Sequence, residues 1–209
     1  MGSGSSATSS QPVVAYTAHG NCYLNITSRC TLRCRFCPKF NHQWVIDGVN
    51  LRLQKEPSVE EVLAAINEPH VYDEIVFCGL GEPTLRLYEM VEIAAELQQR
   101  GARRVRLNTD GLASLVYNRD VTPDLEGPVD AVSISLNAQN EAIYNRHCRP
   151  TLAGSYNAVL EFADRVRDFV PDVTLTAIDG LEGVDIAACE GIARNLGVKF
   201  RRRVLGAVG

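Results

Sequence analysis

The stretch "RCTLRCRFCPKF" at residues 29–40 places three cysteines within eight positions. Cys30, Cys34 and Cys37 follow the β-rich run "CYLNIT" at 22–27 by a few residues. They therefore lie in a loop that leaves a predicted strand, and their C-x3-C-x2-C spacing indicates one compact site. Thiols held this closely are structural, redox-active or metal ligands.

Alternating strand and helix patterns continue from this loop to the end of the chain. Runs rich in apolar and β-branched residues predict six strands, at 22–27, 74–79, 104–109, 131–137, 173–178 and 198–203. Helical periodicity covers 58–68, 86–101, 155–169 and 185–197; a shorter helix is expected at 138–146, and 13–18 is a candidate edge strand. This alternation implies parallel strands with right-handed crossovers, in a sheet that is open and doubly wound or curved as part of a barrel. Either way, functional residues are expected at the carboxyl ends of the strands.

The composition is that of one ordinary globular domain. The chain has 209 residues, 45% of them apolar and 22% charged, and its net charge of −4 does not indicate a nucleic-acid or membrane partner. Residues 1–12 are small and polar and are typical of a disordered or tag-derived tail, so we assign 13–209 to a single domain. No signal peptide or membrane-length apolar run is present, so we expect a cytoplasmic protein. Its seven cysteines are then reduced thiols or metal ligands.

The cysteine spacing favours an iron–sulfur cluster. Four-thiolate zinc sites usually contain two separated C-x2-C pairs, whereas the other four cysteines here are isolated, at positions 22, 78, 148 and 189. A thioredoxin-like pair of Cys34 and Cys37 would leave Cys30 unexplained. Iron–sulfur clusters are held at short, irregular spacings, and three protein ligands leave one iron open to a small molecule. Zinc and plain buried cysteines remain the alternatives.

The motif resembles that of the radical S-adenosylmethionine (SAM) superfamily, with Phe36 directly before the last cysteine. The resemblance implies that Cys30, Cys34 and Cys37 ligate a [4Fe–4S] cluster and that Phe36 shields it. It also implies that SAM chelates the open iron through its amino and carboxylate groups. One electron then cleaves the sulfonium and releases a 5′-deoxyadenosyl radical, which abstracts hydrogen from a substrate.

The second predicted strand ends in "CGLGEPTLR" at 78–86, which resembles the G-G-E-P stretch that receives the SAM amino group in this family. Gly79, Gly81 and Glu82 match it, and Leu80 replaces the commonest second glycine. A carboxylate and backbone carbonyls suit an ammonium group, and glycines let the backbone approach closely. The structural alternative is a tight turn in which Glu82 caps the next helix.

The third predicted strand ends in "LNTDG" at 107–111, which resembles the family's T-N-G-like segment with Asp110 in place of asparagine. The resemblance places Asn108 and Thr109 toward the cofactor or substrate, with Gly111 making the turn. An ordinary Asp-Gly turn explains Asp110 equally well.

The fourth predicted strand ends in "SISLNA" at 133–138, where alternation puts Ser133, Ser135 and Asn137 on one face. Polar side chains on an otherwise apolar strand need partners. The resemblance assigns this strand end to the SAM ribose, so Ser135 and Asn137 are the predicted contacts. Structural lining of a barrel interior is the alternative.

Two later positions complete the predicted SAM site. In "YNRHCRP" at 144–150, Arg149 is predicted to meet the SAM carboxylate. Ile178, at the end of the fifth strand, is a candidate to pack on adenine, with ordinary core packing as its alternative. The basic run at 201–203 is interpreted as a solvated edge strand, because alternation points Arg202 away from its two neighbours.

Four residues near the predicted site have no assigned role. Cys78 and Cys148 are open between ordinary packing and a part in the chemistry, as an additional ligand or hydrogen donor. His42 and Trp44 are open between substrate contact and a cap packed on the cluster.

The motifs occur in the family's order over residues 21–203. The resemblance therefore implies an α/β fold, a partial, laterally open (β/α)6 TIM-like barrel with parallel strands. Several stretches are most similar to the small TatD-family-associated radical SAM proteins, whose substrate that name does not define. A deazaguanine synthase-like enzyme is the runner-up, and a non-catalytic iron–sulfur electron carrier or sensor is the alternative of another class.

The resemblance also implies partners. A reductant such as flavodoxin or ferredoxin must supply the electron, and a TatD-like metal-dependent hydrolase is a candidate associate. The sequence does not indicate the substrate, the hydrogen abstracted or whether SAM is regenerated.

Overall fold

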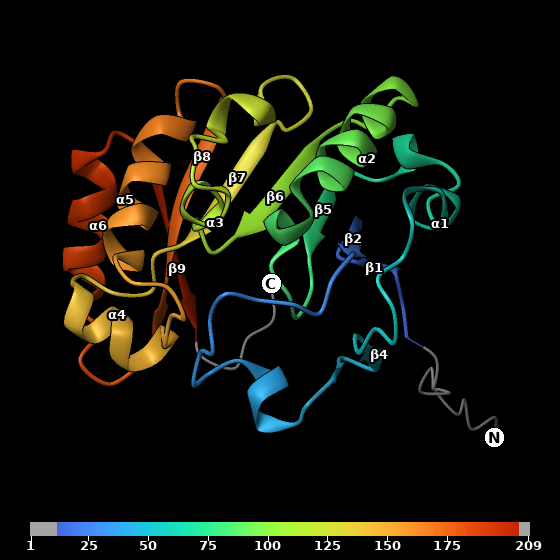
Figure 1. Cartoon of the computed structure of the whole chain (residues 1–209). Coiled ribbons are helices and arrows are strands. Elements are labelled where there is room, and N and C mark those ends of the chain that lie inside the picture. The colour runs from blue at the N-terminus through green and yellow to red at the C-terminus, as the bar shows by residue number, and fades with distance from the viewer. Residues whose placement is uncertain (1–11, 205–209) are drawn as a thin grey trace.

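The computed structural model describes residues 12–204 and contains a seven-stranded sheet with helices packed on it (Figure 1). The sheet strands are β1 (Ala15–Ala18), β2 (Asn21–Asn25), β5 (Ile75–Cys78), β6 (Val105–Thr109), β7 (Ala131–Ser135), β8 (Asp172–Asp179) and β9 (Lys199–Val204). A small hairpin is formed by β3 (Val45–Ile46) and β4 (Val49–Asn50). The helices are α1 (Val59–Ala64), α2 (Leu87–Gln99), α3 (Ala113–Tyr117), α4 (Glu141–Cys148), α5 (Ser155–Val166) and α6 (Ile186–Asn195). Single 3-10 turns are η1 (Pro38–Asn41), η2 (Pro69–Val71), η3 (Pro83–Arg86) and η4 (Thr122–Leu125).

The sheet has the order β1-β2-β5-β6-β7-β8-β9, in which β1 is antiparallel to β2 and every other pair is parallel. The six predicted strands are thus confirmed as six parallel strands, and the candidate edge strand at 13–18 is β1. Because β1 and β9 lie at opposite ends of this order, the sheet does not close on itself. This agrees with the predicted partial, laterally open barrel.

The two faces of the sheet differ in chemistry because side chains alternate along each strand. One face is apolar and packed under the helices; Leu24, Phe77, Leu107, Ile134 and Leu175 on it are completely buried. In Figure 1, α2, α3 and α5 lie over this face. The opposite face, called the inner face below, is polar: Asn108, Ser133 and Thr174 lie beside one another across β6, β7 and β8.

The short elements depart from the predicted boundaries. The helix expected at 138–146 is α4, which begins later because Asn140 caps it by accepting the Ile143 N–H at 3.0 Å. The five-residue α3 was not predicted, since so short a segment carries no readable periodicity. Most of the predicted tail, residues 1–11, lies outside the described residues, as do 205–209 of the predicted domain. No described helix combines the length and apolarity that crossing a membrane requires.

Candidate functional site

The three motif cysteines lie on the loop that leaves the carboxyl end of β2, as predicted. Cys34 is buried, and Cys30 and Cys37 are half-buried. The loop is tightly turned: the Cys37 N–H donates to the Cys34 carbonyl at 3.1 Å, and the Leu32 N–H points at the Cys30 sulfur at 3.4 Å. Residues 26–41, called the cysteine loop below, end in the 3-10 turn η1.

The cysteine loop is docked against the end of α4. The Arg33 N–H donates to the Cys148 carbonyl at 3.0 Å, and the Arg35 N–H donates to the His147 carbonyl at 2.9 Å. A β-bridge between Leu32 and Pro150 continues this pairing. In Figure 1 the blue loop runs from β2 along the lower edge of the sheet toward α4. A loop from one side of the sheet is therefore fastened to the connection that follows β7.

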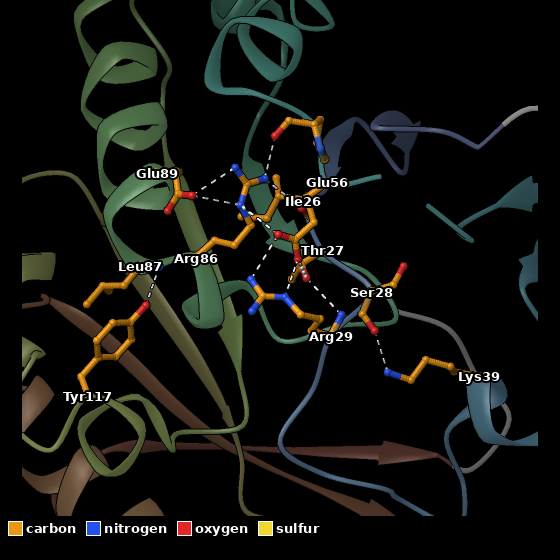
Figure 2. Close-up of polar contacts among 11 residues, drawn as sticks. Ile26, Thr27, Ser28, Arg29, Lys39, Glu56, Arg86, Leu87, Glu89 and Tyr117 are labelled. Atoms are coloured by element: carbon orange, nitrogen blue, oxygen red, sulfur yellow. Dashed lines mark hydrogen bonds and ion pairs between the residues drawn. The ribbon is translucent and has the colours of Figure 1, made fainter. Parts of the chain in front are cut away.

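Hydrogen bonds of two arginines hold the start of the cysteine loop, next to the end of β2 (Figure 2). The buried Arg86 donates through Nη1 to the carbonyls of Ile26 at 3.0 Å and Pro57 at 2.7 Å. Glu56 accepts hydrogen bonds from the Thr27 hydroxyl and from Arg29 Nε, the latter at 2.7 Å. Buried guanidinium–carbonyl contacts hold the strand exit in one conformation.

The pKa of each of the three motif thiols is raised above its ordinary value. A hydrogen bond with Cys148, followed by burial, raises the pKa of the Cys34 thiol far above its ordinary value. Burial also raises the pKa of Cys30 and of Cys37, and each of these two pKa values is raised further by Cys34. The three sulfurs therefore share one environment, and iron must displace their protons to bind thiolates. Among residues 12–204, no three His, Cys, Asp or Glu side chains are arranged to hold a single metal ion.

The glycines after β5 allow that turn to pack directly on the exit of β2. A Cβ atom on Gly81 would lie 2.1 Å from the Thr27 carbonyl oxygen and 2.8 Å from that of Arg29. Gly79 has φ of +113°, and a Cβ there would lie 2.5 Å from Asn25 Oδ1. The Glu82 N–H donates to the Arg29 carbonyl at 2.7 Å. Gly81 thus approaches the cysteine loop and Gly79 the end of β2, while their approach to the SAM amino group stays a prediction.

Glu82 is buried and bonded within the chain. Its Oε1 accepts from the Thr84 N–H at 3.0 Å, the Thr84 hydroxyl at 2.7 Å and the Thr109 hydroxyl at 2.8 Å. Its Oε2 accepts from the Asp110 N–H at 2.6 Å. Glu82 therefore caps η3, as the structural alternative proposed, and ties the end of β5 to the end of β6. Its contact with the SAM amino group stays a prediction.

Asp110 contacts the cysteine loop, in addition to the Asp-Gly turn that its position in "LNTDG" predicts. Its carboxylate accepts from the Thr31 hydroxyl inside the cysteine loop and from the Leu112 N–H at 3.0 Å. Thr31 and Asp110 are 79 positions apart, so no local pattern reveals this contact. The one available signal was an aspartate where the family-like segment has asparagine.

The Glu82–Asp110 pair makes stability fall as pH rises. Burial, and then the charge of Asp110, raises the pKa of Glu82 from 4.5 to about 8, and burial also raises the pKa of Asp110. The folded chain thus holds a proton that the unfolded chain releases, so this stabilisation is complete below pH 4.5 and is lost as pH rises through about 8. We expect the free energy of unfolding, measured with urea, to fall by on the order of 1–3 kcal/mol between about pH 5 and about pH 8.

Asp110→Asn tests this prediction, and Asp164→Asn is its control. Asparagine at 110 removes the neighbouring charge and still offers an oxygen to Thr31, so the pH slope should become smaller. Asp164 is half exposed and forms a surface ion pair with Arg167, so its variant should keep the wild-type slope. Equal slopes in Asp110→Asn and wild type would contradict the assignment to this pair.

Two of the predicted ribose contacts lie at the same sheet edge. Asn137 is buried, adopts φ of +58°, and donates through its backbone N–H to the Thr176 carbonyl at 3.1 Å. Its Nδ2 points at the Cys148 sulfur at 3.9 Å, while its Oδ1 is buried and has no hydrogen-bond partner among the described residues. Ser135 is half-buried at the end of β7. The orphaned Oδ1 is an acceptor available to a ligand.

The remaining predicted residues differ in how far they are buried. Phe36 is half-buried against the core, and Ile178 is 5% exposed near the end of β8. Arg149 follows α4 with φ of +48° and is exposed.

The four unassigned residues have defined surroundings. Cys148 lies against Cys34 and Asn137, as given above. Burial raises the pKa of Cys78 to about 12, and its sulfur is 3.8 Å from the Tyr16 hydroxyl. Trp44 is half-buried with the Arg52 guanidinium 5.5 Å from its ring, and His42 is exposed.

Three thiols on one loop, an unpartnered amide oxygen and close glycine turns fit a cluster held by thiolates with a polar ligand beside it. Thiolates supply the soft ligands that iron–sulfur clusters use, and Cys30, Cys34 and Cys37 are the residues that would hold one.

Comparison with known families identifies the chain by its central region. Residues 24–196 match the family model described as the radical SAM superfamily. The chain is also 29% identical over 119 residues to a probable dual-specificity RNA methyltransferase RlmN of Treponema denticola. That alignment covers 54% of this chain and 32% of the relative, so the chain spans about a third of that relative's length.

Solved structures share the fold at low identity. TYW1 with a lysine-pyruvate adduct bound has a TM-score of 0.62 and 16% identity, over 91% of this chain and 66% of that one. A radical SAM methyltransferase from Sphaerobacter thermophilus has a TM-score of 0.57 and 17% identity, over 91% and 68%. Streptococcus suis SuiB has a TM-score of 0.61 and 11% identity, over 86% and 38%. At these identities the likeness concerns the fold alone.

Proposed function

The chain belongs to the radical SAM superfamily, whose members use a [4Fe–4S] cluster and SAM, and from this membership we propose that it is an enzyme that cleaves SAM reductively. The observation that carries the proposal is the placement of Cys30, Cys34 and Cys37 on one docked loop at the carboxyl end of β2. The bound groups supply one-electron cleavage of the SAM sulfonium and hydrogen abstraction from a substrate.

The chain's own part is to hold, orient and enclose these groups. Cys30, Cys34 and Cys37 bind the cluster through three thiolates and leave one iron without a protein ligand. Phe36, half-buried in the same loop, is proposed to shield one side of the cluster from water. The backbone pairing of the cysteine loop with His147 and Cys148 closes a second side. Excluding water protects a reactive carbon centre from side reactions.

The SAM contacts proposed for this chain lie on the later strands. The unpartnered Oδ1 of Asn137 accepts a hydrogen bond from a ribose hydroxyl, and the Ser135 hydroxyl donates one to the ribose. Thr109, at the end of the neighbouring strand β6, is a further proposed contact. Arg149 is proposed for the carboxylate and Ile178 for adenine. Gly79 and Gly81 supply backbone carbonyls for the amino group. For Glu82, four hydrogen bonds within the chain support a role in holding this turn in place.

The finer placement among the small TatD-family-associated proteins is also our proposal. It rests on "YLNITSRCTLRCRFC", "YDEIVFCGLGEPTLRL" and "VSISLNAQNEAIYNRHCRP", at residues 23–37, 72–87 and 132–150. A flavodoxin- or ferredoxin-like reductant and a TatD-like hydrolase are the proposed partners.

The test is anaerobic reconstitution of the full chain with iron and sulfide, then reduction with SAM present. We expect a paramagnetic reduced-cluster signal that shifts on adding SAM, together with 5′-deoxyadenosine. A cluster that SAM does not perturb would refute the enzyme and favour an electron carrier or sensor. Tightly bound zinc without a cluster would refute both. Turnover of a pterin substrate with magnesium would favour the deazaguanine synthase-like alternative over the TatD-associated placement.

A further inference from the structure

The last strand carries two arginines that face the inner side of the sheet and form no ion pair with another described residue. Arg202 is exposed and forms an ion pair with Asp179. Arg201 lies beside Thr176 and Arg203 beside Ile178, so both lie on the opposite face of the strand from Arg202. Both are half-buried, and the Nε of each is buried and has no hydrogen-bond partner within residues 12–204. The strand lies at the edge of the sheet, as predicted, but these two side chains are only partly exposed to solvent.

Neighbouring basic side chains on β6 and β9, or next to β6, form ion pairs with carboxylates. Glu74 accepts from Arg104 Nε at 3.0 Å and from Arg106, and Asp172 pairs with Lys199 at 2.9 Å. No ion pair reaches Arg201 or Arg203 within the described residues, although Arg201 lies close enough to Arg106 and Glu74 to be influenced by both. A half-buried guanidinium whose buried Nε has no partner loses hydration that a ligand could replace.

The two arginines also repel each other. Burial, and then the charge of Arg106, lowers the pKa of Arg201; burial, and then the charge of Arg201, lowers the pKa of Arg203. The inner face thus concentrates positive charge in a protein whose net charge is −4.

Hydroxyl groups lie beside Arg201. Ser135 is next to Thr176, which is next to Arg201, in adjacent strands. Guanidinium forks with neighbouring hydroxyls match the planar, multidentate geometry of carboxylates and phosphates.

Arg203 lies at the same edge of the sheet as the cysteine loop. Arg203 and Ile178 lie near the carboxyl ends of β9 and β8, the same edge at which the cysteine loop leaves β2. A ligand held by Arg203 would therefore lie at the same edge of the sheet as the cysteine loop.

We propose that Arg201 and Arg203 bind the anionic group, a carboxylate or a phosphate, of the substrate. The substrate class is then an anionic small molecule. This inference rests on the proposed function, because it assigns the arginines to the substrate of the same site. The carboxylate of SAM has the same chemistry and is the other source that the experiment must separate.

The test uses the full chain after anaerobic reconstitution, with inorganic pyrophosphate as the probe at constant ionic strength. Affinity is measured by calorimetry for wild type, Arg201→Gln, Arg203→Gln and the matched control Arg202→Gln. We expect the first two variants to bind about 10- to 100-fold more weakly, as the loss of a charge-assisted contact implies. Arg202→Gln should stay within about twofold of wild type, because Arg202 faces the other side.

Thermal unfolding without pyrophosphate controls for misfolding. Removing an unpaired, self-repelling cation should leave the melting temperature of Arg201→Gln and Arg203→Gln equal to or above that of wild type. Equal weakening in all three variants, or no binding by wild type, would overturn the anion site.

SAM binding by the same variants separates the two sources of the anion. Unchanged SAM affinity in Arg201→Gln and Arg203→Gln supports the substrate assignment. A comparable fall in SAM affinity, with pyrophosphate and SAM competing, would overturn it in favour of the cofactor carboxylate. If wild type binds pyrophosphate through these arginines but forms no 5′-deoxyadenosine from SAM, the proposed function fails and the anion site stands.

Discussion

Replacing Cys34 by alanine should abolish cluster binding while leaving the sheet and its helices intact. Cys34 is the buried member of the three, and its charge raises the pKa of both Cys30 and Cys37. Two half-buried thiols cannot hold a cluster that needs three protein ligands. We expect iron and sulfide after reconstitution to fall to background and 5′-deoxyadenosine to fall by more than about 100-fold.

Two cysteine variants serve as controls. Cys189 is fully buried on α6, so Cys189→Ala removes a packed thiol elsewhere; it should cost about 1–2 kcal/mol of stability and keep the cluster. Cys148→Ala removes the thiol that contacts Cys34, and it should also keep the cluster, because Cys148 lies outside the motif. Circular dichroism checks that each variant folds. A full complement of iron in Cys34→Ala would contradict the ligand assignment.

Gly81→Ala should lose stability and SAM cleavage together. The added Cβ would lie 2.1 Å from the Thr27 carbonyl oxygen and 2.8 Å from that of Arg29, and backbone atoms cannot rotate aside. The turn after β5 or the start of the cysteine loop must therefore move. We expect a loss of about 3 kcal/mol or more in urea unfolding and a fall of about 100-fold in 5′-deoxyadenosine formation.

Gly191→Ala is the matched control. Gly191 lies within α6, and nothing is within 4 Å of a Cβ built on it. Alanine there should leave activity unchanged and raise stability by up to about 1 kcal/mol, since alanine favours the helix more than glycine does. If Gly81→Ala unfolds like Gly191→Ala, the close packing of the turn on the cysteine loop is wrong.

Local patterns were sufficient for the strands and for the place of the cysteines. Period-2 runs separated by helical periodicity identify β2 and β5–β9 because each strand buries one face under helices. The cysteine loop could be placed at the carboxyl edge for the same reason. The half-burial of Arg201 and Arg203 was not predicted, because a strand at the end of the order was expected to be solvated on both faces.

Contacts between distant segments could not be read from the sequence. The Thr31–Asp110 hydrogen bond and the docking of Arg33 on Cys148 join positions far apart, and no alternation or spacing signals them. Glu82 was correctly paired with a turn, but its four hydrogen bonds depend on where Thr109 and Asp110 arrive in three dimensions. Sequence therefore predicts which residues reach the edge, and tertiary packing decides what they touch there.

The docking of the cysteine loop on the end of α4 has a consequence for the order of folding. The Thr151 hydroxyl bonds the Thr31 carbonyl across 120 positions, so this contact closes one of the longest loops in the chain. Closing such a loop costs more entropy than local contacts do, and it follows the assembly of the strands between its ends. A nascent chain that stops before residue 147 carries all three cysteines but lacks the surface that shapes them. Cluster loading is thus a late event, which waits for most of the sheet to form.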